Sequence, residues 1–206
     1  MAQNKISAAD RERRHGHQGL VIWLTGLSGA GKTTIATELE WQLFHSGKHT
    51  YLLDGDILRR GLCRDLDFSA GARHENIRRA GDLAVLFADA GLIVVAAFIS
   101  PYRADRDRVR SLLPKGCFIE VFVNAPLEFC AQRDVKGLYA KARANQIENF
   151  TGISAPYEPP EKPEIELHTD QMSADAAVDA IVDYLRKSTQ AMEPPPLASN
   201  SSQTVR

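Results

Sequence analysis

A glycine-rich segment, Gly26-Leu27-Ser28-Gly29-Ala30-Gly31-Lys32-Thr33, separates an apolar run from a stretch with helical periodicity. It matches G-x-x-x-x-G-K-[ST] in the strand–loop–helix setting that this motif requires. Glycines let several backbone N–H groups turn toward one anion, and the start of the following helix adds partial positive charge. The segment therefore predicts a loop that binds nucleotide phosphates. The alternative, a glycine-rich turn with an incidental Lys-Thr pair, is disfavoured by the amphipathic pattern Ile35-Leu39-Leu43 that follows.

Two side chains of this loop are predicted to contact the phosphates or their metal ion. Lys32 supplies a mobile positive charge for the outer phosphates, and Thr33 can give its hydroxyl to Mg²⁺. The loop alone leaves a GTPase, a motor ATPase and a small-molecule kinase open. No guanine-reading Asn-Lys-x-Asp segment follows a later apolar run, and the sequence lacks the Leu-Ser-Gly-Gly signature of transport ATPases. The small-molecule kinase is therefore favoured.

The alternation of apolar runs with helix-period stretches predicts a three-layer α/β fold around a parallel sheet. The apolar runs are continuous, as in strands that are covered on both faces. The predicted strands are residues 20–24, 50–53, 92–99 and 118–123, and the predicted helices are residues 33–46, 73–90, 104–113 and 173–187. Ligands of such sheets bind beyond the carboxyl ends of the strands, where we expect the site.

A length of 206 residues fits a single domain. We assign residues 19–187 to the phosphate-binding domain, residues 1–18 to a flexible N-terminal segment, and residues 188–206, with Pro194-Pro195-Pro196, to a disordered C-terminal tail. His15-Gly16-His17 in the first segment lacks the context of a metal site.

Charge and cysteine usage narrow the partners and the compartment. A formal net charge of −1 gives no electrostatic reason to expect nucleic acid or a membrane, which leaves small molecules. No stretch approaches the roughly 18 uninterrupted apolar residues that a membrane helix needs. The three cysteines are odd in number and widely spaced, so we expect a reducing compartment and a cytoplasmic protein.

Two carboxylates, Asp54 and Asp56, follow the second apolar run, in a strand that we expect next to the phosphate loop. A carboxylate there can accept the proton of an acceptor hydroxyl or organise Mg²⁺. A plain β-turn with solvated acids is the alternative, and the position after an apolar run disfavours it.

Six arginines come soon afterwards, and sequence alone supports two interpretations of them equally. Arginine pairs bidentately with phosphate or sulfate oxygens, which suits a multiply anionic acceptor. The alternative is a solvated helix face with Glu75 and Asp82 as partners. The six are Arg59, Arg60, Arg64, Arg73, Arg78 and Arg79.

Taken in order, these segments resemble the adenylylsulfate kinase family, which phosphorylates the 3′-hydroxyl of adenylyl sulfate (adenosine 5′-phosphosulfate). The resemblance covers residues 16–185. It implies ATP and adenylyl sulfate as substrates, Mg²⁺ as cofactor, a homodimer and a functional link to ATP sulfurylase in sulfate activation. The motifs that carry it are Ile22-Trp23-Leu24-Thr25-Gly26-Leu27-Ser28-Gly29, Asp54-Gly55-Asp56, Glu75-Asn76-Ile77-Arg78-Arg79, Phe98-Ile99-Ser100-Pro101-Tyr102-Arg103, Lys136-Gly137-Leu138-Tyr139 and Phe150-Thr151-Gly152-Ile153-Ser154-Ala155-Pro156-Tyr157-Glu158.

The resemblance also implies roles for individual residues. Lys32, Asp56 and Ser100 are the implied catalytic residues, with Asp56 at the ribose 3′-hydroxyl, while Phe68 and Phe150 stack on the acceptor adenine. We expect Ser100 to hydrogen-bond substrate rather than become phosphorylated, because no base neighbours it in sequence and in-line transfer needs no relay. ATP contacts add Thr34 and Arg133 to the loop, metal ligands are Thr33 and Asp54, and acceptor contacts are Asp54, Asp56, Arg59, Phe68, Arg73, Asn76, Ile99, Ser100, Lys136, Phe150 and Thr151.

The stretch from residue 133 to residue 157 resembles the mobile lid of this family. It is polar, basic and glycine-containing, with Lys136, Lys141 and Arg143. Closure of a lid would exclude water that could otherwise take the γ-phosphoryl group, and it would complete a cationic cage. A surface loop with unrelated charges is the alternative.

Two positions depart from the family pattern beside the expected acceptor site. Ile57 stands where asparagine is common and removes a hydrogen-bonding side chain, while Asp67 stands where glycine is common and adds negative charge. Two rival functions therefore stay open: a kinase for another small hydroxyl acceptor, such as a sugar acid or nucleoside, and a regulatory nucleotide-binding module without turnover.

Overall fold

A parallel sheet of five strands forms the centre of the computed structural model, which describes residues 5–134 and 137–192. The strand order is β2-β3-β1-β4-β5, and every neighbouring pair is parallel. The predicted α/β fold is confirmed. The strands are β1 (Leu20–Thr25), β2 (Thr50–Asp54), β3 (Ile93–Ala97), β4 (Phe118–Asn124) and β5 (Ile165–His168).

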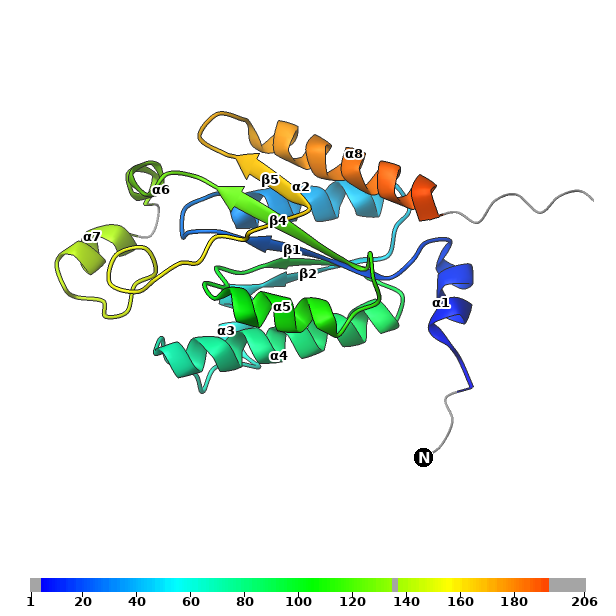
Figure 1. The fold of residues 1–206 in the computed structure, drawn as a ribbon, viewed down its shortest axis with the longest axis horizontal. Helices are drawn as coiled ribbons and strands as arrows, with labels where there is room; N and C mark the ends of the chain where they lie inside the picture. Colours follow the sequence, from blue (N-terminus) through cyan, green and yellow to red (C-terminus); the bar gives the residue numbers. More distant parts are fainter. Residues whose placement is uncertain (1–4, 135–136, 193–206) are drawn as a thin grey trace, which may run out of the picture.

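Helices cover both faces of the sheet (Figure 1). α2 (Lys32–His45) and α8 (Ala174–Met192) pack on one face, and α4 (Ala70–Asp89) and α5 (Arg103–Ser111) pack on the other. Because both faces are covered, all residues of β1 and β3 are buried. This burial explains why the sequence shows continuous apolar runs rather than alternation.

Shorter helices lie at the two ends of the strands (Figure 1). α6 (Leu127–Arg133) and α7 (Leu138–Arg143) lie beyond the carboxyl ends of the strands, whereas α1 (Ala8–His15) lies at the opposite end. α3 (Gly55–Arg60) follows β2 directly. These four helices and β5 are not among the predicted elements, since none of them has a long periodic pattern.

Helix α1 lies within the segment assigned to residues 1–18. It begins with a capping box between Ser7 and Asp10, and no residue of the helix is buried. Polar contacts hold it to the domain, with Arg11 3.7 Å from Asp89 and Nδ1 of His15 3.0 Å from the carbonyl oxygen of Gly91. At the other end of the chain, α8 extends past the predicted boundary at residue 187, and residues 193–206 of the predicted tail lie outside the described residues.

The second strand ends next to the phosphate loop, as expected, because the hydroxyl of Thr33 lies 3.0 Å from Oδ2 of Asp54. β2 is an edge strand, and β3 lies between it and β1. Chain order does not determine strand order in a parallel sheet, because a crossover connection can pass over a neighbouring position. Within the described residues, none of the helices has the length and apolar character that a bilayer-spanning segment requires.

Candidate active site

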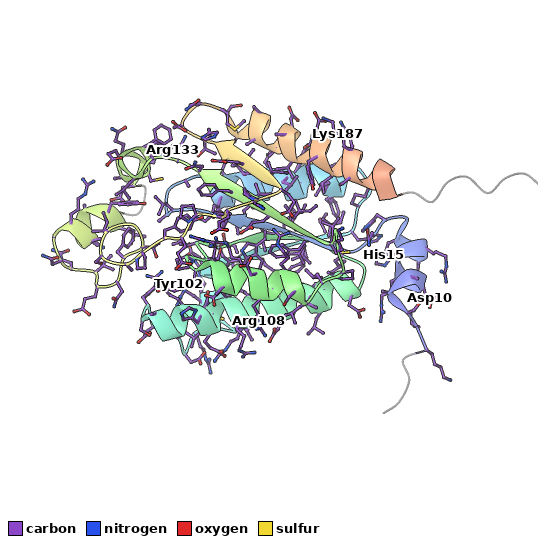
Figure 2. All side chains as sticks on the ribbon, in the orientation of Figure 1. Asp10, His15, Tyr102, Arg108, Arg133 and Lys187 are labelled. Atoms are coloured by element: carbon purple, nitrogen blue, oxygen red, sulfur yellow. The ribbon has the colours of Figure 1, made fainter. Side chains whose placement is uncertain are left out.

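A cavity of about 900 Å³ opens at the carboxyl ends of the strands. Its wall includes the phosphate loop, the ends of β2 and β3, the start of α4, and residues of the 133–157 segment. Figure 2 shows Arg133, a residue of this wall, at the end of the molecule opposite His15. The cavity therefore lies where parallel α/β sheets bind their ligands.

The phosphate loop connects β1 to α2. Gly26 has φ 154°, and a Cβ at this position would lie 2.3 Å from the carbonyl oxygen of Val123, so only glycine lets the loop pack against β4. Residues 28–34 line the cavity, whereas Gly26 and Leu27 do not border it. Their carbonyl oxygens instead accept hydrogen bonds from Nζ of Lys32, at 3.0 and 2.8 Å.

Arg133, at the end of α6, is a predicted ATP-binding residue that lies outside the phosphate loop. Its guanidinium lies 4.4 Å from the ring centroid of Phe129 and donates to the carbonyl oxygen of Thr169 at 3.5 Å. Nη1 lies 3.6 Å from the point where a Cβ on Gly31 would stand, so the arginine covers the glycine-rich turn. The structure thus brings together residues 28–34 and Arg133 around one part of the cavity.

The two carboxylates at the end of β2 have different surroundings. Oδ2 of Asp54 accepts a hydrogen bond of 3.0 Å from the hydroxyl of Thr33, and Oδ1 accepts one of 2.8 Å from the backbone N–H of Asp56. Asp54 is buried and caps α3, whereas Asp56 is exposed and lines the cavity. The alternative of a plain turn with solvated acids is therefore wrong for Asp54.

The Thr33–Asp54 pair suits Mg²⁺ by the chemistry of its donors. A hydroxyl and a carboxylate are hard oxygen ligands, and Mg²⁺ at nucleotide sites commonly takes one or two carboxylates together with phosphate oxygens. Among the described residues, no group of three or more His, Cys, Asp or Glu side chains could hold a metal ion by itself. The residues thus fit a metal that arrives with the nucleotide.

Two of the six arginines face the cavity. Arg73 is buried, and it donates to the hydroxyl of Thr151 at 2.7 Å, to the carbonyl oxygen of Phe68 at 3.0 Å and to that of Asn149. The guanidinium of Arg59 lies 4.3 Å from the ring centroid of Phe68. Burial lowers the pKa of both arginines below its usual range. An anion in the cavity would restore part of the lost solvation.

Two other arginines belong to an exposed ion-pair face of α4. Arg78 pairs with Glu75 at 2.6 Å, and Arg79 pairs with Glu75 at 2.8 Å and with Asp65 at 2.6 Å. The interpretation as a solvated helix face is therefore right for Arg78 and Arg79, whereas anion binding by Arg59 and Arg73 stays a prediction.

The two predicted stacking rings line the cavity but differ in burial. Phe68 is 55% exposed, while Phe150 is 8% exposed and belongs to the core. The Phe150 ring meets Tyr139 edge-on, with centroids 4.9 Å apart and an interplanar angle of 76°. Phe150 therefore belongs to the hydrophobic core and also lines the cavity.

Ser100 follows β3 with φ 40° and lines the cavity, although its side chain is turned into the protein. Its hydroxyl accepts from Nε1 of Trp23 at 3.1 Å and donates to Oγ1 of Thr25 at 2.9 Å. An indole N–H and a hydroxyl are not bases, so nothing bonded to Ser100 activates it as a nucleophile. The guanidinium of Arg106 donates a hydrogen bond of 2.6 Å to the carbonyl oxygen of Ser100. The same guanidinium forms a 2.7 Å salt bridge with the buried Glu120.

The side-chain amide of Asn76 could bind a polar ligand. Its side chain is 5% exposed and lines the cavity, and its Nδ2 has no hydrogen-bond partner among the described residues. A buried amide without partners costs about 1–3 kcal/mol, so a polar ligand at this position would be stabilising.

Comparison with known proteins identifies the family. Residues 18–168 match the family model described as adenylylsulphate kinase. The chain belongs to this family. An adenylyl-sulfate kinase of Aeromonas hydrophila is 57% identical over 181 residues, which are 88% of this chain and 92% of the relative.

Two solved structures of the adenylylsulphate kinase family extend the comparison. The Mycobacterium tuberculosis APS kinase in complex with AMPPNP and APS superposes with a TM-score of 0.79 at 43% identity, covering 82% of this chain and 98% of that one. A hexameric APS kinase from Thiobacillus denitrificans gives 0.64 at 32% identity, covering 87% of this chain and 31% of that one.

The departures from the adenylylsulphate kinase pattern have local explanations. Oδ1 of Asp67 accepts hydrogen bonds from the backbone N–H and the hydroxyl of Ser69, at 2.9 and 2.7 Å, and these bonds lower the pKa of Asp67. Its charge is thus turned to the start of α4. Ile57 is 59% exposed and is not among the residues that line the cavity.

Some residues that line the cavity were not predicted from the sequence, and one predicted substrate contact, Lys136, has no described position. Lys136 lies outside the described residues. Thr169, Met172 and Ile147 also line the cavity, and the hydroxyl of Thr169 bonds the carbonyl oxygen of Ala30 at 2.8 Å. No signal marked Thr169, because the short strand β5 before it was not predicted.

Proposed function

We propose that this chain catalyses the reaction of the adenylylsulphate kinase family, the ATP-dependent phosphorylation of the 3′-hydroxyl of adenylyl sulfate, which yields 3′-phosphoadenylyl sulfate and ADP. One observation carries the proposal: a single cavity is bordered by the phosphate loop, an exposed carboxylate, two phenylalanine rings and two buried or half-buried arginines. A kinase for a sugar acid needs the first two features but not the rings. A regulatory module needs none of the acceptor features.

The donor side acts by position and charge. Backbone N–H groups of residues 28–34 bind the phosphates, and Lys32 exchanges its bonds to loop carbonyls for bonds to the outer phosphates. Thr33 and Asp54 would hold a Mg²⁺ ion that arrives with ATP, and the ion would supply positive charge to neutralise the phosphates. Arg133 adds a further positive charge near Gly31.

On the acceptor side, Asp54 and Asp56 have different roles. Asp54 is occupied by Thr33 and by the N-terminus of α3, whereas Asp56 lines the cavity and takes the proton of the 3′-hydroxyl. Phe68 and Phe150 stack on the adenine, and Arg59, Arg73 and Asn76 bind the phosphosulfate and nearby groups.

The Ser100 segment and the 133–157 segment complete the site. Ile99 and Ser100 form the wall at the end of β3, with Ser100 in a positioning role. Thr151 bonds Arg73 and so fixes the segment that carries Phe150. Closure of the 133–157 segment as a lid, contact of Lys136 with substrate, a homodimer and a functional link to ATP sulfurylase stay predictions from the resemblance.

An acceptor screen tests the proposal. ADP release is measured with ATP and Mg²⁺ against adenylyl sulfate, adenosine, gluconate and water, with Lys32→Ala as the inactive control. We expect release with adenylyl sulfate to exceed release with every other acceptor by at least about 100-fold, because only this acceptor has both an adenine for the rings and a phosphosulfate group for the arginines. Equal release with gluconate would favour the sugar-acid kinase, and no release with any acceptor would favour the regulatory module.

A further inference from the structure

Tyr139 on α7 contacts both halves of the cavity. Its hydroxyl donates a hydrogen bond of 2.8 Å to the carbonyl oxygen of Ser28 in the phosphate loop, and its ring meets Phe150 edge-on at 4.9 Å. The side chain is only 2% exposed. Burial raises the pKa of Tyr139, so the phenol stays protonated and remains a donor.

The bond to Ser28 acts on the donor side through a single peptide unit. The C=O of Ser28 and the N–H of Gly29 belong to one planar trans peptide and point in opposite directions. A carbonyl held by Tyr139 therefore turns the N–H of Gly29 away from Tyr139, as a donor for a nucleotide phosphate. Gly29 lines the cavity and has φ 78°, a conformation that other residues rarely adopt.

The ring of Tyr139 acts on the acceptor side. Phe150 lines the cavity, and the next residue, Thr151, is bonded to Arg73. The backbone at Tyr139 is anchored by the carboxylate of Asp134, which accepts hydrogen bonds from the backbone N–H groups of Tyr139 and Ala140, at 3.0 and 3.1 Å. When the phosphate loop moves, the Ser28 carbonyl therefore turns the Tyr139 side chain on its fixed backbone, and the Tyr139 ring moves Phe150.

We propose that Tyr139 is a positioning residue that couples the two substrate sites. Nucleotide in the phosphate loop fixes the Ser28 carbonyl, which fixes Tyr139 and, through its ring, the face that Phe150 offers to the acceptor. The inference rests on the proposed function for the identity of the acceptor. Because coupling is reciprocal, the acceptor tightens nucleotide binding by the same factor.

Tyr139→Phe tests the coupling because it removes the hydroxyl and keeps the ring against Phe150. Kd for adenylyl sulfate is measured by calorimetry with and without a non-hydrolysable ATP analogue, and Kd for the analogue is measured with and without adenylyl sulfate. In the wild type we expect each ligand to tighten the other by about fivefold or more. The variant should lose about two- to tenfold of this factor, the worth of one hydrogen bond, while Kd for adenylyl sulfate alone stays within twofold.

Two further variants separate coupling from simple loosening of the fold. Tyr139→Leu also removes the ring edge, so it should weaken adenylyl sulfate even without nucleotide. Tyr184→Phe, which removes the hydroxyl of a half-buried tyrosine on α8, should keep the wild-type coupling. An unchanged coupling factor in Tyr139→Phe, or no coupling in the wild type, overturns the proposal.

A second readout needs no acceptor and so separates this inference from the proposed function. Lys141 and Arg143 on α7 are exposed, which makes trypsin cleavage there a measure of how firmly α7 is held. The ATP analogue should slow cleavage in the wild type and slow it several-fold less in Tyr139→Phe. Equal protection in both proteins overturns the coupling. Protection that depends on Tyr139 in a protein that fails to bind adenylyl sulfate supports the coupling and overturns the proposed function.

Discussion

The hydroxyl of Thr33 donates a 3.0 Å hydrogen bond to Oδ2 of Asp54. This bond joins the phosphate loop after β1 to the end of β2, although β3 lies between the two strands. The carboxylate of Asp54 is also held by the backbone N–H of Asp56. Asp54 therefore bonds both the loop and the start of α3, and in the proposed function Asp56, which lines the cavity, acts on the acceptor.

Asp56→Asn should lower kcat by about 10²–10⁴-fold with little change in Kd for adenylyl sulfate, because the amide keeps the shape but loses the basicity. Asp54→Asn should instead raise the Mg²⁺ concentration needed for half-maximal activity. Titration of Mg²⁺ in both variants under steady-state conditions measures this difference. Rescue of Asp56→Asn by Mg²⁺, with no rescue of Asp54→Asn, would exchange the two roles.

The two phenylalanines should separate binding from stability. Phe68→Ala and Phe150→Ala should each weaken adenylyl sulfate by about tenfold to hundredfold, the worth of a stack of roughly 1–3 kcal/mol. Phe150→Ala should also lower the free energy of unfolding by about 3–5 kcal/mol because it empties a core position. Phe68→Ala should lower it by less than about 1 kcal/mol, since the ring is exposed. Calorimetry and urea unfolding measure both quantities. Equal weakening of an ATP analogue by either variant would place that ring on the donor side.

Much of the fold was predictable because its central elements carry strong local signals. The glycines of the loop, the continuous run of β1 and the Ile35-Leu39-Leu43 stripe of α2 mark the donor half of the site. Strand order was not predictable, because pairing depends on contacts between distant segments. β5 was missed because only one of its four residues is buried.

The site itself was predictable where a motif carried it. The Asp54-Gly55-Asp56 segment and the arginines could be named from the sequence, but their division of labour could not, because it depends on which acid Thr33 reaches and which arginines find partners on α4. The Tyr139–Ser28 bond spans 111 residues and has no local signal.

Ser100→Ala should keep kcat within about tenfold of the wild type, since the buried hydroxyl serves Trp23 and Thr25 rather than the substrate. Loss of a buried hydrogen-bond partner should cost about 1–3 kcal/mol of stability. Mass spectrometry of the wild type after incubation with ATP should find no phosphate on Ser100. A loss as large as that of Asp56→Asn, or a phosphorylated Ser100, would establish a direct chemical role.

His17 should make the stability of the protein depend on pH. Burial lowers its pKa below the usual value of 6.5, and the charge of Lys48 acts in the same direction. Its Nε2 accepts the backbone N–H of His49 at 3.0 Å, which only the neutral ring can do. The folded state then holds fewer protons than the unfolded state below about pH 6.5, so stability should fall as the pH drops through this range. Urea unfolding between pH 7.5 and pH 5 should show a smaller loss for His17→Gln than for the wild type, and equal losses would contradict the assignment.

The central claim is that one cavity brings the γ-phosphoryl group of ATP to the 3′-hydroxyl of adenylyl sulfate. The most direct test is to identify the product by phosphorus and proton NMR after incubation of the protein with ATP, Mg²⁺ and adenylyl sulfate, beside a reaction with the 3′-deoxy analogue. We predict a new phosphomonoester on the 3′-oxygen, in equal amount to the ADP formed, and no ADP above background with the analogue. ADP formed at the same rate from the 3′-deoxy analogue, or a phosphate on any other oxygen, would contradict the account.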